Sequence, residues 1–431
     1  MPTSARAWTH RPSSASTPPS RSPTPRRSPR RTTSTTTSTC SATRSAAGTP
    51  STSARRGRTA ARTSAAWTAP TCRARPSTPT PARTRPTPPR PRSEKRSRRG
   101  RTMAVMRYRE ALNAALREEM VRDENVMLMG EDIGVFNGAF KVTAGLLDEF
   151  GEKRVRDTPI SENTIVGMGV GAAMTGLRPV VELMTINFSL LAMDQIVNHA
   201  ATIRYMFGGQ VKVPLVVRMP QGAGHQLGPT HSHSWEALYL HVPGLLVAVP
   251  TTAADAKGLL KSAIRDDNPV VFIEHEYLYG QRGEVPDDDD FTVRFGVAAI
   301  RREGSDVTVV GISRMVLTAA RAAKTLSAEH GIEAEVIDPR TLRPLDLDTI
   351  LASVRRTNRC VIVEEGWPHG GVGANLAALI QEQAFDDLDA PVQRVTGADV
   401  PMPYSKALEE LAFPHEPQIV DAVLATFRDR E

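Results

Sequence analysis

The first 102 residues of the chain contain no leucine, isoleucine, valine or phenylalanine. A segment without these side chains has almost nothing apolar to bury, so burial cannot offset the entropy cost of ordering it. It also holds a single acidic residue, Glu94, against 23 lysines and arginines. Of the formal net charge of +7, this segment contributes +22 and the remaining residues contribute −15. We therefore expect a disordered, basic, Pro/Ser/Arg-rich tail at residues 1–102 and an acidic folded body after it.

Three interpretations of the tail remain open. A basic arm can bind nucleic acid by neutralising phosphates, but only Trp8 and Trp67 could stack on bases. An Arg- and Ser-rich, acid-poor segment is also typical of organellar transit peptides, although no apolar helical face is present. Our hypothesis is that the tail, built mostly from residues with GC-rich codons, is out-of-frame translation upstream of a start at Met103 or Met106. Peptides from residues 32–92 in a mass spectrum of the native protein would contradict it.

Cysteine and long apolar runs are scarce in the body. Cys360 is the one cysteine after residue 102, so no disulfide framework can form there. No stretch of about 18 residues is apolar and free of charge, as a membrane-spanning helix requires, and no secretory apolar core precedes Met103. We expect a cytoplasmic protein that does not enter a membrane.

Helical and strand-like patterns alternate along the body, which is typical of mostly parallel sheets covered by helices on both faces. The run Asp287–Asp290 indicates a linker. We therefore place one α/β domain at residues 103–290 and a second at 291–431. The expected helices are 108–122, one that begins at Glu162, 189–205, 317–329, 347–355 and 373–383. The expected strands are 126–129, 179–183, 213–218, 245–249, 307–311, 334–337 and 361–363.

One acidic residue lies at a predicted helix start. In the run Asp157–Ala173, Pro159 disfavours helix before it, Ser161 is a good N-cap, and Glu162 follows in the first turn. The recurring Gly and Ala after it let the helix approach another element closely. Glu162 could simply complement the helix dipole, worth about 0.3–1 kcal/mol. It could also be a functional carboxyl presented at a loop-to-helix junction.

Further candidates follow predicted strands, where open parallel sheets bind ligands. Glu131 follows the 126–129 strand, Phe188 the 179–183 strand, and His231 and His233 lie in the glycine-rich loop after the 213–218 strand. A zinc site at the histidines lacks a cysteine or a compact fourth ligand. A hydrolase based on Ser232 and His231 lacks the nucleophile-elbow pattern.

Two long blocks resemble one enzyme family. The first runs from Asp157 through Gly176-Leu177-Arg178-Pro179 to Asn198, and the second is Val395–Tyr404. Both are similar to the β subunit of the first, decarboxylating component of the thiamine-diphosphate-dependent 2-oxoacid dehydrogenases. The resemblance extends from about Tyr108 to about Phe427. It implies a transketolase-like α/β fold of two domains, a pyrimidine-binding domain with a parallel sheet and then a transketolase C-terminal domain.

The resemblance also implies roles for the candidate residues. Glu162 corresponds to the carboxylic acid that interacts with N1′ of the cofactor's aminopyrimidine, Phe188 would stack on that ring, and Glu131 would contribute to cofactor binding. His231 corresponds to the histidine that helps transfer the acyl group to a lipoyl arm. The family has glutamine where this chain has His233, so the role of that position stays open.

A potassium site is implied in the same way. In the family, backbone carbonyls and an acid around the segment Ser262–Pro269 hold the ion, with a further carbonyl from a preceding strand. The corresponding residues here are Leu215, Ala263, Asp266 and Asn268. An acidic residue before an Asn-Pro pair fits an ordinary tight turn equally well.

An absent motif predicts a partner. The chain has no Gly-Asp-Gly followed by an asparagine 25 to 30 residues later, which the thiamine family uses to hold magnesium and the diphosphate. In split enzymes of the family this half belongs to an α subunit, so the resemblance implies an α2β2 heterotetramer with magnesium on α. It further implies a lipoyl-bearing acyltransferase partner. We expect the glycine-rich helix after Glu162 and the loop 365–371 to contact other subunits.

The substrate and the class of protein have alternatives. Arg340–Pro344 and Gly397–Tyr404 resemble the pyruvate branch of the family more closely than the branched-chain 2-oxoacid branch. A single-chain transketolase-like enzyme would need the missing diphosphate motif. A nucleic-acid-binding protein would depend on the tail, and the body's charge of −15 argues against phosphate-rich partners.

Deleting residues 1–102 separates these classes. We expect the deletion to leave enzymatic activity intact and to abolish any affinity for nucleic acid, because the basic residues are concentrated there. Activity assays and a nucleic-acid binding titration on both chains measure this. Activity lost with the tail would contradict the assignment of catalysis to the folded body.

Overall fold

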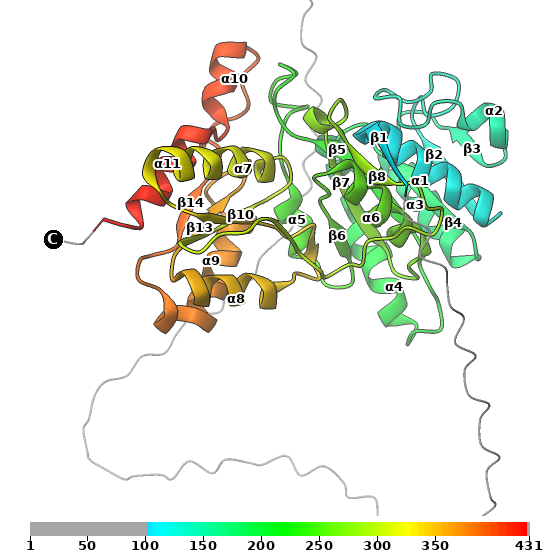
Figure 1. Ribbon diagram of the computed structural model, residues 1–431. Helices are drawn as coiled ribbons and strands as arrows, with labels where there is room; N and C mark the ends of the chain where they lie inside the picture. The colour runs from blue at the N-terminus through cyan, green and yellow to red at the C-terminus, as the bar shows by residue number, and fades with distance from the viewer. Residues whose placement is uncertain (1–101, 429–431) are drawn as a thin grey trace, which may run out of the picture. The chain divides into compact units, whose positions relative to one another are not determined.

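Two twisted sheets build the part of the chain that this computed structural model describes, residues 102–428 (Figure 1). The segment predicted to be disordered lies outside the described residues except for Thr102. The first sheet has the order β12-β6-β7-β5-β4-β2-β3, and every strand but β12 runs parallel to its neighbour. Its strands are β2 (Val126–Gly130), β3 (Val155–Asp157), β4 (Arg178–Glu182), β5 (Val216–Gln221), β6 (Leu246–Ala248), β7 (Val270–His275) and β12 (Thr341–Arg343).

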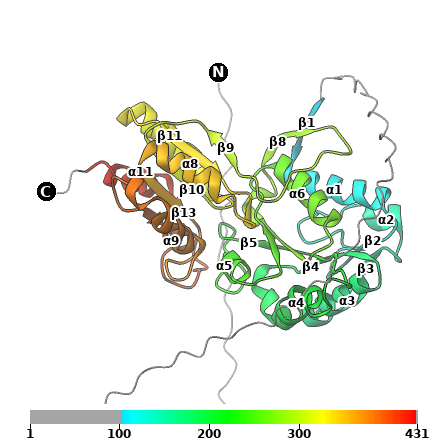
Figure 2. The ribbon, with the colours of Figure 1, turned by 90° about the horizontal axis from the view of Figure 1, so that it is seen from below.

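Helices cover both faces of this sheet because its strands are apolar on both sides. Val126 and Leu128 of β2 face one cluster of buried side chains, whereas Met127 and Met129 face another. Figure 2 shows the two helical layers on either side of the strands. One layer contains α1 (Tyr108–Arg122) and α6 (Ala253–Arg265). The other contains α3 (Glu162–Met174), η1 (Ile186–Ala192), η2 (Gln195–Ala200), α4 (Ala201–Met206) and α5 (Glu236–Leu240).

The second sheet has the order β14-β13-β10-β11-β9 and is parallel except for β9. Its strands are β9 (Ala299–Arg302), β10 (Val307–Gly311), β11 (Ala334–Asp338), β13 (Cys360–Val363) and β14 (Gln393–Val395). Figure 1 shows α7 and α11 on one face and α8 and α9 on the other. These helices are α7 (Met315–Thr325), α8 (Leu347–Thr357), α9 (Val372–Ala384) and α11 (Glu416–Ala425).

Short elements complete the chain. The antiparallel pair is β1 (Met103–Arg107) and β8 (Arg282–Pro286). The remaining helical turns are α2 (Leu146–Phe150), η3 (Glu276–Leu278), η4 (Leu326–His330), η5 (Phe385–Asp387) and α10 (Lys406–Ala412). The two-sheet α/β architecture confirms the predicted fold class. β12, from the second half of the sequence, adds to the sheet of the first half through β6.

Two predicted elements differ from the structure. The single helix expected at 189–205 is a 3-10 turn, a π-helical turn and a short α-helix, and Ser189 Oγ donates to the Ile186 carbonyl at 2.5 Å within the first of them. A serine hydroxyl that binds a nearby carbonyl competes with the regular helical pattern. The strand expected at 213–218 begins only at Val216, because Pro214 has no N–H to donate to a ladder.

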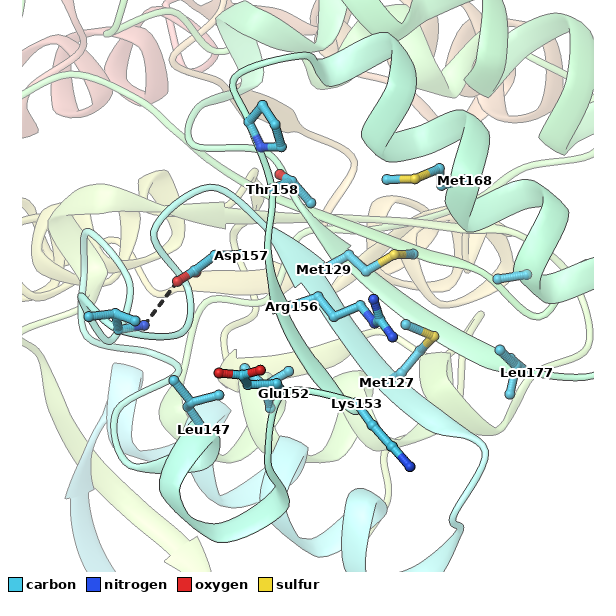
Figure 3. Close-up of a pocket in the computed structure, with 14 residues that line it drawn as sticks. Met127, Met129, Leu147, Glu152, Lys153, Arg156, Asp157, Thr158, Met168 and Leu177 are labelled. Carbon is cyan, nitrogen blue, oxygen red and sulfur yellow. Dashed lines mark hydrogen bonds between the residues drawn. The ribbon is translucent and has the colours of Figure 1, made fainter.

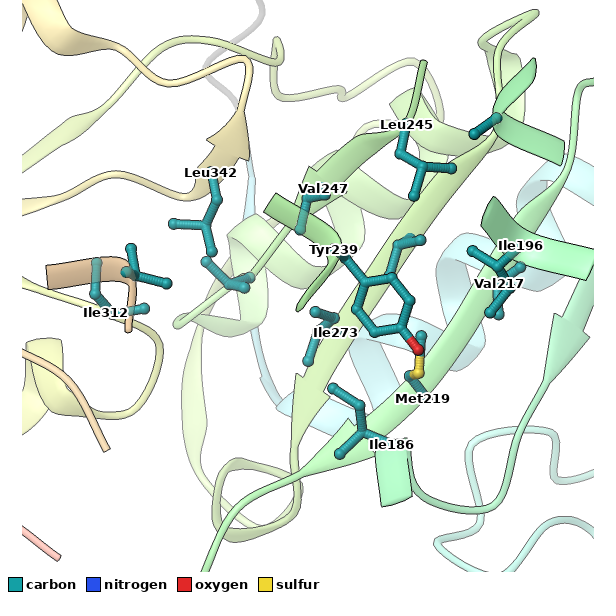
Figure 4. Close-up of a cluster of buried hydrophobic side chains, with 14 of the residues drawn as sticks. Ile186, Ile196, Val217, Met219, Tyr239, Leu245, Val247, Ile273, Ile312 and Leu342 are labelled. Carbon is teal, nitrogen blue, oxygen red and sulfur yellow. The ribbon is translucent and has the colours of Figure 1, made fainter. Parts of the chain in front are cut away.

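A continuous apolar core fixes the segment that carries Phe188. In Figure 4 the Tyr239 ring of α5 lies among Ile186, Val217, Met219 and Ile273. Its hydroxyl donates to Ser189 Oγ in η1. Burial raises the pKa of Tyr239 to about 12 although this hydrogen bond opposes the shift, so the group stays a neutral donor.

A buried charge bridges three neighbouring strands of the first sheet. Arg218 on β5 binds Glu274 of β7 through two nitrogens, at 2.7 and 2.5 Å, and also pairs with Glu182 of β4. Arg218 and Glu274 are at most 1% exposed and Glu182 is 7% exposed. Removing the cation would leave two carboxylates buried without their partner.

We predict that Arg218→Met lowers the free energy of unfolding by about 3–5 kcal/mol. Lys212→Met is the control, because Lys212 is exposed and pairs with Asp267 at the surface, where a bridge contributes only about 0–1 kcal/mol. Urea unfolding of the two variants measures the difference. Equal effects would show that the buried bridge adds no more than the exposed one.

Candidate functional site

Two buried carboxyl groups lie at the point where the strand order of the first sheet reverses. From β2 the chain moves outward to β3 and then returns to the other side of β2 as β4. Such a reversal opens a crevice beyond the carboxyl ends of the strands. Glu131 follows β2 directly and is 6% exposed, and Glu162, the first residue of α3, is 3% exposed.

The backbone brings these two groups together. The Thr158 N–H, four residues before Glu162, donates to the Gly130 carbonyl at 2.9 Å. The Asp157 carboxylate accepts the N–H groups of Gly134 at 2.6 Å and Val135 at 3.0 Å, which ties the loop after Glu131 to the end of β3 (Figure 3). The segment before α3 and the loop after β2 are therefore held side by side.

The start of α3 is built as expected, with one difference. Ser161 occupies the N-cap position, but its hydroxyl binds Thr164 Oγ1 at 2.8 Å and not a backbone N–H. Gly169 allows the predicted close approach, because a Cβ there would lie 2.8 Å from Val181 of β4. Gly169 thus allows α3 to pack closely against its own sheet.

The buried Glu131 carboxyl group has the properties expected of a ligand-binding residue. Burial, then the negative charges of Glu162 and Asp132, raise its pKa above the ordinary value. Within the described residues its Oε1 atom has no hydrogen-bond partner, and neither does the buried Thr158 Oγ1. Buried polar atoms without partners are costly and uncommon in proteins, so these atoms fit a polar ring that binds beside Glu162.

A second pair joins an aromatic ring and an imidazole. Phe188 of η1 and His231 of the loop after β5 meet edge to face, with ring centroids 5.1 Å apart and an interplanar angle of 80°. Both side chains are half-buried. The Nδ1 atom of His231 lies 2.9 Å from Thr230 Oγ1, which leaves Nε2 for another group. The structure therefore brings together Glu131 with Glu162, and Phe188 with His231.

His233, where the chain departs from the resembled pattern, belongs to a different environment from His231. Its Nδ1 is 3.0 Å from the Asn187 amide nitrogen, and its ring stacks on Trp235 at 5.3 Å and contacts Trp367 at 4.7 Å. Burial lowers its pKa. A neutral ring that accepts from Asn187 carries its proton on Nε2, which has no partner among the described residues.

Sequence reasoning missed several residues that shape this region. Asn187 is next to Phe188 and could have been noticed from that position. Thr158 and Trp367 were not assigned a role, although they lie in the run Asp157–Ala173 and in the loop 365–371, which were both singled out. Glu365 and Glu409, in the second half of the chain, accept hydrogen bonds from the loop that follows β5 and carries His231. No local sequence pattern signals that contact.

The four residues of the predicted potassium site surround one turn between α6 and β7. The Leu215 carbonyl accepts from the Val270 N–H at 2.8 Å, and the Ala263 carbonyl from the Asp266 N–H at 3.3 Å. Asp266 Oδ1 accepts both the backbone and the side-chain N–H of Asn268, each at 2.8 Å, as in an ordinary Asx turn. Arg178 Nη1 donates to the Asp266 carbonyl at 2.9 Å. Each carbonyl keeps a second lone pair, but a guanidinium already supplies positive charge here.

Three further features of the described residues bear on the site. Residues 102–428 contain no cluster of three or more His, Cys, Asp or Glu side chains able to hold a metal. A hollow of about 660 Å³ lies along β3 and includes Thr158 and Met168 but none of the four paired residues (Figure 3). None of the helices in this part of the chain has the length and apolarity that a membrane crossing requires.

Comparison with known proteins identifies the class. The family models described as "Transketolase, pyrimidine binding domain" and "Transketolase, C-terminal domain" match residues 104–281 and 296–419. A solved structure titled "Split gene transketolase, inactive beta4 tetramer" superposes with a TM-score of 0.60 at 25% identity, covering 74% of this chain and 97% of that one. Fold and matches together define a transketolase-like chain of two α/β domains.

Curated relatives narrow the assignment. The pyruvate dehydrogenase E1 component subunit beta of Rhizobium meliloti is 53% identical over 76% of this chain and 71% of its own length. The protein of the same name from Rickettsia felis is 53% identical over 73% and 96%, and the mitochondrial beta-1 subunit of rice is 54% identical over 74% and 85%. The chain belongs to the family of pyruvate dehydrogenase E1 component beta subunits, which confirms the resemblance.

The Glu131 carboxyl gives a pH-dependent prediction. Its raised pKa means that folding favours the protonated form, so its ionisation destabilises the folded chain. That cost is absent well below the unfolded carboxyl pKa of roughly 4.3 and grows as pH rises through the higher folded value. We predict that Glu131→Gln stabilises the chain at neutral pH and that the gain disappears in acid.

Thermal unfolding between pH 4 and 8 measures this effect, with the exposed Glu152→Gln as the control. A difference in unfolding temperature between wild type and Glu131→Gln that stays constant across this range would contradict a raised pKa of the buried Glu131 carboxyl.

Proposed function

We propose that this chain is the β subunit of the first component of a pyruvate dehydrogenase complex. With an α subunit it would decarboxylate pyruvate on thiamine diphosphate and pass the acetyl group to lipoamide. The single observation that carries the proposal is the buried pair Glu131 and Glu162 at the reversal of strand order. The names of the relatives support the substrate.

The chain's own residues would bind the pyrimidine end of the cofactor. When bound, thiamine diphosphate supplies an electron sink for the carbon–carbon bond that breaks. Glu162 would share a proton with N1′ of the aminopyrimidine, and the protonated form that Glu131 favours would keep a second negative charge away from it. Phe188 would stack on the ring, a contact worth about 0.5–1.5 kcal/mol beyond area burial.

His231 would serve the transfer of the acyl group. In that step the acyl carbon would form a bond to one sulfur of the lipoyl disulfide as the sulfur–sulfur bond breaks, and the second sulfur would take up a proton. The bond between the acyl carbon and the cofactor would break, and its electron pair would stay with the cofactor. The disulfide is thus the oxidant. The half-buried imidazole of His231, beside Phe188, has a nitrogen available to deliver that proton.

We infer that an α subunit completes the site in an α2β2 assembly and holds magnesium with the diphosphate. The missing Gly-Asp-Gly motif supports this, as does a related split-gene transketolase whose β4 tetramer is titled inactive. A hollow of about 340 Å³ borders the loop 365–371 that we expect at an interface. Beside it, Trp235 Nε1 and Glu236 Oε2 are buried without partners within the described residues.

The C-terminal half is our candidate surface for the lipoyl-bearing acyltransferase. Cys360, the one cysteine among residues 102–428, is buried and unpaired, which supports a cytoplasmic location. A branched-chain 2-oxoacid stays an alternative substrate, since one or two methylenes change binding by only about 1–3 kcal/mol.

Potassium at Leu215, Ala263, Asp266 and Asn268 stays a proposal. Comparing the unfolding of the chain in potassium chloride with its unfolding in choline chloride would test it.

We predict that the chain reduces an artificial electron acceptor with pyruvate only when the α subunit is present. Glu162→Gln should lower kcat by about 100-fold or more, because general acid–base contributions are of order 10²–10⁴. The matched control is Glu152→Gln, an exposed carboxyl of the same half. Comparing pyruvate with 3-methyl-2-oxobutanoate identifies the preferred substrate.

Undiminished activity of Glu162→Gln would leave the carboxyl with a helix-dipole role only. Full activity without an α chain would refute the split site.

A further inference from the structure

The loop that carries His231 has an unusual backbone. After β5, left-handed φ angles occur at every second residue, at 101° for Gly222, 115° for Gly224, 56° for Gln226 and 76° for Gly228. For Gln226, which has a Cβ, this conformation is strained. Alternation of this kind turns backbone N–H groups toward one side and makes a concave site for an anion. The loop therefore needs negative groups to hold it.

Two carboxylates from the second half of the chain supply them. Glu409 of α10 accepts the N–H of Gly224 at 2.9 Å and that of Gln226 at 3.0 Å. Glu365, which follows β13, accepts the Ala223 N–H at 2.6 Å and the Ser234 hydroxyl at 3.3 Å. These carboxylates bind both ends of the segment around His231. Their side chains are buried, with Glu409 at 0% exposure and Glu365 at 8%.

The charge on Glu365 is maintained by its neighbours. Burial by itself raises its pKa, but His275 and Arg314, with the hydrogen bonds from His275 and Ala223, lower it to about 2. His275 Nδ1 accepts the Tyr277 N–H at 3.2 Å, so the proton lies on Nε2, 3.0 Å from Glu365. Arg314 also donates to the Ala223 carbonyl at 2.8 Å. The loop is thus bound through donors and acceptors alike.

The aromatic ring of Tyr404 also packs against the loop. The Tyr404 ring, two residues before α10, lies so close to Gly228 that a Cβ at 228 would be 2.2 Å from it. The Gly228 carbonyl in turn accepts the His231 N–H at 3.3 Å. The segment that ends in α10 therefore contacts the backbone next to His231 through both Tyr404 and Glu409.

We propose that Glu409 and Glu365 are positioning residues for His231. They act through the backbone of the loop and keep the imidazole against Phe188, where acyl transfer needs it. The inference rests on the proposed function. Without Glu409, the Gly224 and Gln226 N–H groups lose their acceptor, the left-handed positions relax, and the imidazole leaves Phe188.

The test uses the full chain with its α subunit and two assays. One measures pyruvate-dependent reduction of an artificial acceptor, which needs no transfer to lipoamide, and the other measures acetylation of a free lipoyl domain. We expect Glu409→Ala to lower lipoyl acetylation by about 100-fold, as misplacement of about 1 Å can, with artificial-acceptor activity and the KM for pyruvate within about threefold of wild type. Glu409→Gln, which keeps an acceptor oxygen, should recover most of the loss.

Asp346→Ala is the matched control. Its carboxylate also accepts backbone N–H groups, from Ala298 at 2.8 Å and Thr349 at 3.2 Å, but these lie away from the loop. We expect the ratio of the two activities to be unchanged. If Glu409→Ala fails to assemble, Glu409→Asp replaces it, since the shorter side chain cannot reach both N–H groups and should give the same split.

Equal losses in both assays, or none in either, overturn the inference while the proposed function stands. A wild-type pair that is inactive with pyruvate overturns the proposed function, and the inference with it.

Discussion

The reversal of strand order beside β2 is the constraint on which the site depends. Because β3 and β4 lie on opposite sides of β2, the chain segments that leave these strands diverge and open a crevice at their carboxyl ends. Glu131, the start of α3 and the segment with Phe188 all follow from that edge. Gly130 is needed there, since a Cβ would lie 2.8 Å from the Glu182 carbonyl. The fold thus places two buried carboxyl groups at the carboxyl ends of the strands.

Buried charge is the second theme, and pairing with an opposite charge makes it tolerable. Arg218 pairs with one carboxylate on each of its two neighbouring strands, and Arg314 with the neutral His275 supports Glu365. A third buried carboxyl group near the loop that carries His231, Glu276, has a raised pKa. Burial, then the negative charges of Glu365 and Glu409, raise its pKa to about 8, so it is protonated at neutral pH. The Glu276 carboxyl group therefore stays protonated beside Glu365 and Glu409.

Local patterns predicted the elements in which the apolar residues are buried and the polar residues are exposed. Residues 126–129 and 108–122 were found because their apolar side chains are buried at regular spacing. The central strand β7 was missed although its run Val270–Ile273 is as apolar as residues 126–129. What the pattern could not show is that Glu274 and His275 at its end are buried, because their partners Arg218 and Glu365 lie far away in the sequence. Glu162 was recognised from its position at a helix start and from the family resemblance. Glu409 could not be recognised, since its partner Gly224 lies 185 residues away.

The central claim is that this chain holds only the pyrimidine half of a thiamine diphosphate site. The most direct test is calorimetric titration of thiamine diphosphate with magnesium into this chain alone, and then into its mixture with the α subunit. The account predicts no saturable binding by the chain alone and stoichiometric binding by the mixture. Stoichiometric binding by the chain alone would contradict it, because the residues that seat the diphosphate would then have to lie within these 431 residues.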